Sequence, residues 1–110
     1  MSEERTPEKA VSFILENAKE FAAAKGRRVY LEEFRKSKKA LLMADCEEKT
    51  AVAREQYAYA HPEYLSLLDG LKAAIEIEET LKWRLLAAQI SVDIWRSQEA
   101  SNRNQDRVMR

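Results

Sequence analysis

The stretch that follows Pro62 constrains the fold most, because Gly70 is the only helix-breaking residue before the apolar pattern stops near Glu99. Hydrophobic residues recur along it at steps of three and four, which is the spacing of one helix face. Pro62 itself suits the first turn of a helix, where its missing N–H is not needed. A continuous helix over residues 62–99 would extend about 57 Å at 1.5 Å per residue. The sequence therefore predicts a long C-terminal helix.

The composition favours an all-α fold for the whole chain. Its 110 residues are sized for one domain, and they include only two glycines and two prolines. β-Sandwiches and doubly wound α/β folds use more of these residues in their turns. The hydrophobic residues, 45% of the chain, recur periodically and exclude disorder. We expect a helical bundle with a single domain over residues 1–99 and a basic, flexible tail over residues 100–110.

The first helix is predicted to start at Thr6 and Pro7, a capping residue followed by a first-turn proline. It is expected to end near Gly26, which can adopt the left-handed conformation of a C-terminal cap. An alternative continues this helix through Gly26 at a cost of about 1 kcal/mol relative to alanine. The sequence favours the break.

Two more helices are predicted before the long one. The second covers residues 29–47, and the third begins after Thr50, which can cap it. The third helix should end at His61, because the residue before a proline is pushed out of the α region. His61 is therefore interpreted as a helix-boundary residue.

The long helix carries a heptad-like apolar pattern, which we call the seam. The seam consists of Leu71, Glu78, Leu85 and Val92 at one heptad position and Ala74, Leu81, Ala88 and Trp95 at the other. A second apolar edge runs through Leu67, Ile77, Leu86, Ile90 and Ile94. Together they are wider than a two-stranded coiled-coil stripe, so the helix should be covered on more than one side. This chain's other helices and a second copy are the expected cover.

We therefore expect a coiled-coil-like homo-oligomer. Its interface is predicted to contain Leu71, Leu81, Leu85, Val92, Trp95 and Trp83. Trp95 lies on the seam and is expected in the core or the interface. Trp83 lies off the seam and either anchors a partner, as tryptophans in interfaces do, or packs beneath the preceding helices.

Charge is segregated along the chain although 19 basic and 19 acidic side chains cancel. Residues 25–39 are strongly basic, whereas residues 45–79 are acidic. Three interpretations stay open for the basic block: contact with nucleic-acid phosphates, a solvated helix face, or pairing with the acidic stretch of another subunit. Tyr30 and Phe34 interleave with the basic residues and could stack on bases of a single strand.

The predicted phosphate contacts are Lys25, Arg27, Arg28, Arg35, Lys36, Lys38 and Lys39, with Arg96, Arg103 and Arg107 as secondary contacts.

The sequence gives little support for catalysis. Cys46 has acidic neighbours that disfavour its thiolate, so it is interpreted as a small, partly buried apolar residue. The carboxylates of residues 76–79 lack the Glu-x-x-His motif of di-iron bundles. We expect no enzyme activity, cofactor, metal or small-molecule substrate.

A cytoplasmic protein without membrane contact is expected, because the sequence has no 18-residue apolar run and its N-terminus has no signal-peptide character.

Four stretches carry a resemblance: residues 30–43 (YLEEFRKSKKALLM), residues 54–58 (REQYA), the HPEY turn at residues 61–64, and residues 95–103 (WRSQEASNR). Over residues 28–103 the chain resembles a family of small α-helical proteins of tailed bacteriophages and prophages. Such proteins are mostly of unassigned function and are often encoded among recombination and replication genes.

The resemblance implies an accessory role in DNA recombination or replication in the host cytoplasm, through contact with DNA or with a recombination or replication protein. It supplies no catalytic residues. The alternative is a protein-interaction module that docks on a host or phage protein without binding DNA.

Overall fold

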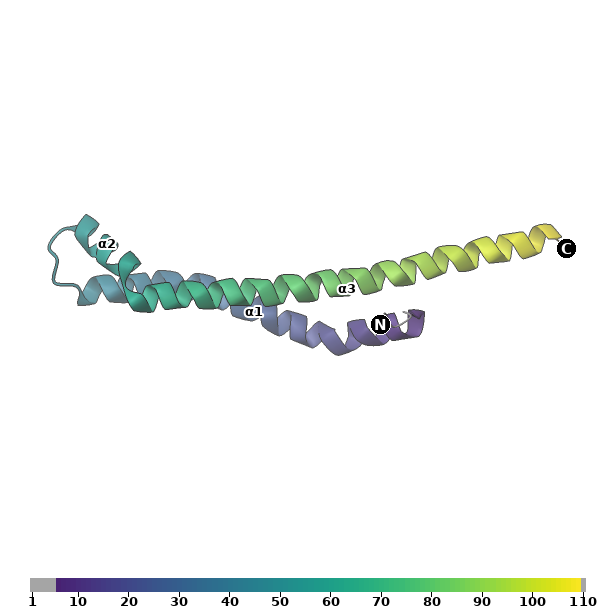
Figure 1. Ribbon diagram of the computed structural model, residues 1–110, viewed down its shortest axis with the longest axis horizontal. Coiled ribbons are helices and arrows are strands. Elements are labelled where there is room, and N and C mark those ends of the chain that lie inside the picture. The colour runs from purple at the N-terminus through teal and green to yellow at the C-terminus, as the bar shows by residue number, and fades with distance from the viewer. Residues whose placement is uncertain (1–5, 110) are drawn as a thin grey trace. The chain divides into compact units, whose positions relative to one another are not determined.

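The computed structural model of the protein describes residues 6–109. These residues form an all-α structure of three helices: α1 (Pro7–Asp45), α2 (Ala51–Ala60) and α3 (Pro62–Met109) (Figure 1). The prediction of an all-α fold with a long C-terminal helix is thus confirmed.

The N-termini of α1 and α2 are capped as their sequences predict. The Thr6 hydroxyl oxygen accepts a hydrogen bond from the backbone N–H of Lys9 at 3.2 Å. The Thr50 hydroxyl oxygen accepts one from the backbone N–H of Ala53 at 3.1 Å. Each bond satisfies one of the donors that a helix leaves unpaired in its first turn.

His61 is the boundary residue between α2 and α3. Its backbone is extended, with φ −66° and ψ 135°, as expected for a residue that precedes a proline. Its ring nitrogen Nδ1 accepts a hydrogen bond from the backbone N–H of Glu63 at 3.1 Å. The ring also lies edge-on to Tyr57, with 5.5 Å between the centroids. The structural interpretation of this histidine is confirmed.

The predicted break at Gly26 is wrong, because α1 continues through it and no separate helix starts at residue 29. Gly26 does not adopt a positive φ, so it is an ordinary helical residue. A glycine inside a helix costs only about 1 kcal/mol relative to alanine. Just past Gly26, Arg28 donates to Glu78 on α3, a contact that favours continuing the helix.

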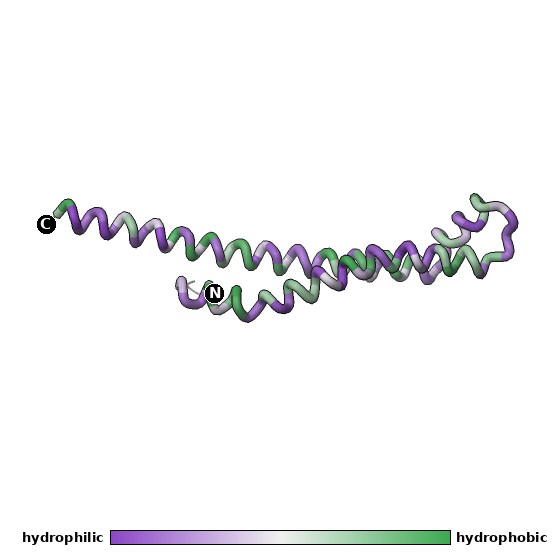
Figure 2. The backbone as a smooth tube through the Cα atoms, turned by 180° about the vertical axis from the view of Figure 1, so that it is seen from behind, coloured by the Kyte–Doolittle hydropathy of each residue, from purple (hydrophilic) through white to green (hydrophobic). Residues whose placement is uncertain are grey.

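The long helix extends past its expected end near Glu99, as far as Met109. Residues 100–109 contain neither glycine nor proline, so no residue interrupts the helix there. Their side chains are exposed, and Figure 2 shows that this end of α3 is largely hydrophilic. The helix boundary was therefore predicted too early, whereas the flexibility of the tail stays a prediction.

The chain divides into two compact units. Unit 2 is Ala22–Glu79, and unit 1 combines Met1–Phe21 with Thr80–Arg110, of which residues 6–21 and 80–109 are described. Helices α1 and α3 contribute to both units. The single domain expected over residues 1–99 stays a prediction.

The core of unit 2 forms where its three helices meet. Leu42 of α1, Ala58 of α2 and Tyr64 of α3 are buried together, and Met43 and Leu68 pack against them. The short α2 is held in place by this cluster, which also sets its aromatic side chains beside the basic residues of α1.

Candidate functional site

The basic block does not form one surface, because some of its cations turn toward α3. Arg28 donates to both carboxylate oxygens of Glu78, with 3.0 Å between NH2 and Oε1, and its NH1 donates to Glu32 at 3.1 Å. Hydrogen bonding to Glu78, and then to Glu32, raises the pKa of Arg28 above its ordinary value. Glu78 is only 8% exposed. This contact explains why a glutamate lies on the seam. It also means that Arg28, a predicted phosphate contact, is already bound to a carboxylate.

Two lysines of the block are also paired. Lys38 Nζ lies 3.0 Å from the Glu63 carboxylate, and the hydrogen bond from Lys38 lowers the pKa of Glu63. Lys36 Nζ lies 3.4 Å from Glu33, with both side chains exposed. The acidic stretch thus meets the basic block within one chain. Pairing between subunits is not needed to bring the opposite charges together.

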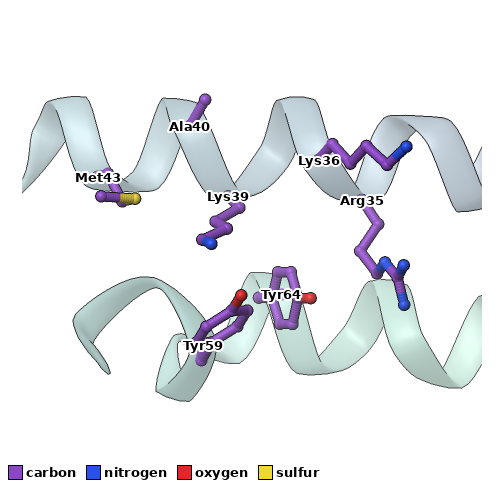
Figure 3. A pocket seen from close by; sticks show the side chains of 7 residues that line it. All are labelled: Arg35, Lys36, Lys39, Ala40, Met43, Tyr59 and Tyr64. Carbon is purple, nitrogen blue, oxygen red and sulfur yellow. The ribbon is translucent and has the colours of Figure 1, made fainter. Parts of the chain in front are cut away.

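Three basic side chains of the block line a hollow in unit 2 with a volume of about 630 Å³. Its lining is Arg35, Lys36, Lys39, Ala40, Met43, Tyr59 and Tyr64. Figure 3 shows Arg35 and Lys39 reaching from α1 toward the side of the hollow that carries Tyr59 and Tyr64. We call this cavity the basic hollow.

Lys39 is the most firmly held cation of the basic hollow. Its Nζ lies 2.6 Å from the Glu55 carboxylate and 4.7 Å from the centroid of the Tyr59 ring. Glu55, and then Tyr59, hold the pKa of Lys39 above its ordinary value, so the ammonium stays charged at neutral pH. Tyr59 lies edge-on to Tyr64, with 5.3 Å between their centroids. The hollow therefore combines an aromatic surface with a lysine whose charge is already compensated by Glu55.

Arg35, Lys25 and Arg27 form no ion pair with another described residue. Arg35 is half-buried at the basic hollow, whereas Lys25 and Arg27 are exposed on α1. Tyr30 and Phe34 stack on each other, with 5.8 Å between centroids and 6° between ring planes. Tyr59 is a further aromatic neighbour of the basic block, through Lys39, and stacking of Tyr30 and Phe34 on bases stays a prediction.

Sequence reasoning missed Tyr59 and Tyr64 as site residues. Their spacing contains no sign that α2 packs back against α1. The HPEY turn offered the available signal, because it marks where the chain changes direction beside two tyrosines. The secondary contacts Arg96, Arg103 and Arg107 are exposed residues of unit 1, whereas the basic hollow lies in unit 2.

The seam packs mostly within the chain. Leu71, Ala74, Glu78 and Ala88 are buried, whereas Leu81, Leu85 and Val92 are half-buried. Trp95, at the end of the seam, is 43% exposed and lies outside the core of the single chain. The predicted interface roles of these residues stay predictions, but an intrachain contact already accounts for the burial of most of them.

A different face of α3 leaves large apolar side chains exposed. Trp83, Leu86, Ile90 and Ile94, which we call the outer stripe, are 61%, 37%, 48% and 53% exposed. They are spaced by three or four residues and therefore share one face of the helix, away from the seam. Packing of Trp83 beneath the preceding helices is wrong, given its exposure.

The described residues hold few other chemical features. Cys46 is buried, as expected for a small apolar residue, and its Sγ accepts a hydrogen bond from the backbone N–H of Glu48 at 3.4 Å. Within residues 6–109, no three metal-binding side chains gather into a cluster. Nor does any described helix combine the length and apolar character needed to cross a membrane.

Fold and surface together define an all-α protein with a basic, aromatic-lined hollow in one unit and an exposed apolar helix face in the other. No protein-family model matches the chain, and the comparisons with curated proteins and with solved structures find no match. The resemblance to phage proteins therefore stays a prediction.

Proposed function

We propose that this chain is a non-enzymatic accessory protein of phage DNA recombination or replication that contacts nucleic acid through the basic hollow, in the cytoplasm of the host cell. The observation that supports it is the convergence of Arg35, Lys36 and Lys39 with Tyr59 around one cavity. Cations neutralise phosphates, and aromatic rings stack on bases. Both requirements are met within a single site.

The state of each cation supports this choice of site. Arg35 has no described ion-pair partner, and the contact between Lys36 and Glu33 is exposed and long enough to exchange for a phosphate. Lys39 is bound to Glu55 beside Tyr59, so a phosphate reaches its ammonium only by displacing that carboxylate. A single strand fits better than a duplex, because its unstacked bases can reach an aromatic ring.

Fluorescence anisotropy with labelled single- and double-stranded oligonucleotides, measured over a range of salt concentrations, tests the proposal. We expect binding that weakens as salt rises, since phosphate contacts release counterions. The double substitution Arg35→Ala with Lys36→Ala should reduce the salt slope on single strands by about 0.7 for each lost phosphate contact. Tyr59→Leu should weaken binding, whereas Tyr59→Phe keeps the ring and should have little effect.

The matched control is Lys9→Ala with Lys19→Ala, which removes the same charge from exposed positions of α1 outside the basic block. This control should retain most of the affinity. Binding that is absent at low salt, that ignores salt, or that falls equally in the control would contradict the proposal.

The outer stripe favours a second candidate, a protein-interaction module that does not bind DNA. Exposed tryptophan and branched aliphatic side chains on one helix face are typical of a surface that becomes buried in a complex. This candidate predicts no oligonucleotide binding and a loss of partner binding when the stripe carries a charge.

A further inference from the structure

The side chains of the outer stripe remain between 37% and 61% exposed in the single chain. Neighbouring apolar surface lies within the same unit. An apolar groove of about 320 Å³ runs between α1 and α3, where Ile14 and Phe21 face Leu86. Leu86 therefore belongs both to the stripe and to the edge of the groove. A partner helix laid on the stripe would also reach this edge.

We propose that the outer stripe binds a second copy of this chain, with the two α3 helices antiparallel and their two-fold axis level with Ala88. The inference is independent of nucleic-acid binding, because the basic hollow lies in unit 2 and the stripe lies in unit 1. It assigns the outer stripe a different occupant from the host or phage protein of the second candidate function.

Self-complementarity of the stripe supports this arrangement. An antiparallel pair with this axis sets Leu86 opposite the partner subunit's Ile90, and Trp83 beside the partner subunit's Ile94. The same contacts repeat on the other side of the axis, as a two-fold interface requires. Every member of the stripe then meets an apolar residue, and each large ring meets a branched aliphatic side chain.

The charges beside the stripe favour the same direction. Lys82 and Asp93 are exposed, lie on the same flank of the stripe, and form no ion pair with another described residue. Antiparallel helices bring equal flanks together, so Lys82 comes level with the partner subunit's Asp93, twice in each dimer. Parallel helices would bring opposite flanks together, and the opposite flank carries Arg84 with Ala87 and Ser91, so Lys82 would come near another cation. Charge complementarity therefore selects the antiparallel pair.

Sedimentation velocity over a range of protein concentrations tests for the dimer. Ile90→Glu should raise the dissociation constant of the dimer at least tenfold, because it would bury an unpaired carboxylate at the centre of the interface. Leu15→Glu is the matched control: it makes the same change at an exposed apolar position of α1 in unit 1. It should change the constant by less than about twofold, within the range usual for surface positions. Circular dichroism checks that both variants keep their helices.

Two measurements test the orientation. Lys82→Asp and Asp93→Lys should each weaken the dimer, and their combination should restore it. Spin labels at Gln98→Cys, with Cys46→Ala to remove the native thiol, should report helix positions about 30 Å apart in the antiparallel dimer. Parallel helices would bring the same positions to about 10 Å.

A monomer at all concentrations would overturn the inference, as would a dimer that Ile90→Glu leaves intact. A short distance between the labels would overturn the antiparallel orientation. A monomer that binds another protein through the stripe would likewise overturn the second copy as its occupant. Oligonucleotide binding by the Ile90→Glu variant separates the two proposals. A variant that no longer dimerises but still binds oligonucleotides leaves the proposal for the basic hollow unaffected.

Discussion

In unit 2 the helices α1 and α3 are joined by ion pairs as well as apolar contacts, whereas the described residues of unit 1 join the same helices through an apolar groove. The cross-helix pairs Arg28–Glu78 and Lys38–Glu63 both lie in unit 2. The later residue of α1 pairs with the earlier residue of α3, so the two helices run antiparallel. The two pairs fix which residues of the helices lie side by side. In unit 2, charged pairs fix the alignment of α1 with α3. In unit 1, apolar side chains remain exposed and offer a surface for binding.

The difference extends to what each unit leaves exposed. Unit 2 uses several of its charges internally and retains Arg35 and Lys36 at the basic hollow. Unit 1 buries the small side chain of Ala88 at its seam and leaves the larger Ile90 and Ile94 outside. The first pattern suits an anionic partner, and the second suits an apolar one.

The largest expected effect tests whether unit 2 depends on its apolar core more than on its charges. Leu42→Ala removes a side chain that is 5% exposed, so we expect the free energy of unfolding to fall by about 2–4 kcal/mol. Leu41→Ala is the control, because the adjacent residue is 60% exposed and should cost well under about 1 kcal/mol. Urea unfolding followed by circular dichroism measures both. Equal losses would show that the Leu42 cluster does not hold unit 2 together.

The next effect concerns the Arg28–Glu78 ion pair of unit 2. Arg28→Met removes the bidentate partner of Glu78 and leaves a nearly buried carboxylate, so the melting temperature should fall more than in the exposed control Lys36→Met. Adding Glu78→Leu to Arg28→Met should recover most of the loss, because it removes the nearly buried carboxylate that has lost Arg28. A double variant no more stable than Arg28→Met alone would contradict this explanation.

The comparison also shows what the sequence could predict. Thr50, His61 and Pro62 predict helix ends correctly, because capping and the restriction before proline act within a few residues. The heptad pattern identifies the buried face of α3, including Ala74 and Ala88, because periodicity reports which side of a helix is covered. Each of these signals is local or repeats along one helix.

Contacts between residues far apart in the sequence could not be predicted from local patterns. The pairing of Arg28 with Glu78 joins positions 50 residues apart, so the sequence left open whether the basic block contacts phosphates, solvent or an acidic stretch. Tyr59 lies at the basic hollow because α2 packs against α1, and no local pattern predicts that packing. Gly26 was assigned as a helix end from its type alone, although tertiary contacts beyond it outweigh a small propensity cost.

A smaller effect probes α1 near the start of unit 2. Gly26→Ala should raise the free energy of unfolding by about 0.5–1 kcal/mol, since alanine is the better helix former. An added Cβ meets nothing within 4 Å there, and the glycine has no positive φ. Gly70→Ala on α3 offers the same open space and should behave alike. A destabilised Gly26→Ala variant would mean that α1 needs to bend or open at this position.

The smallest effect is the pH dependence that Lys38–Glu63 gives to unit 2. The hydrogen bond from Lys38 lowers the pKa of Glu63 in the folded chain, and the first turn of α3 also favours its negative charge. A carboxyl with a lowered folded pKa adds stability above its unfolded pKa and loses it as the pH falls through the folded value. Glu63→Gln should therefore cost stability at pH 7 and little at pH 3, by a small amount because the Glu63 side chain is 60% exposed. Urea unfolding at both pH values measures this, with Glu20→Gln on an exposed site of unit 1 as the control. A Glu63→Gln cost that is the same at both pH values would show that the ion pair does not contribute to the acid sensitivity of unit 2.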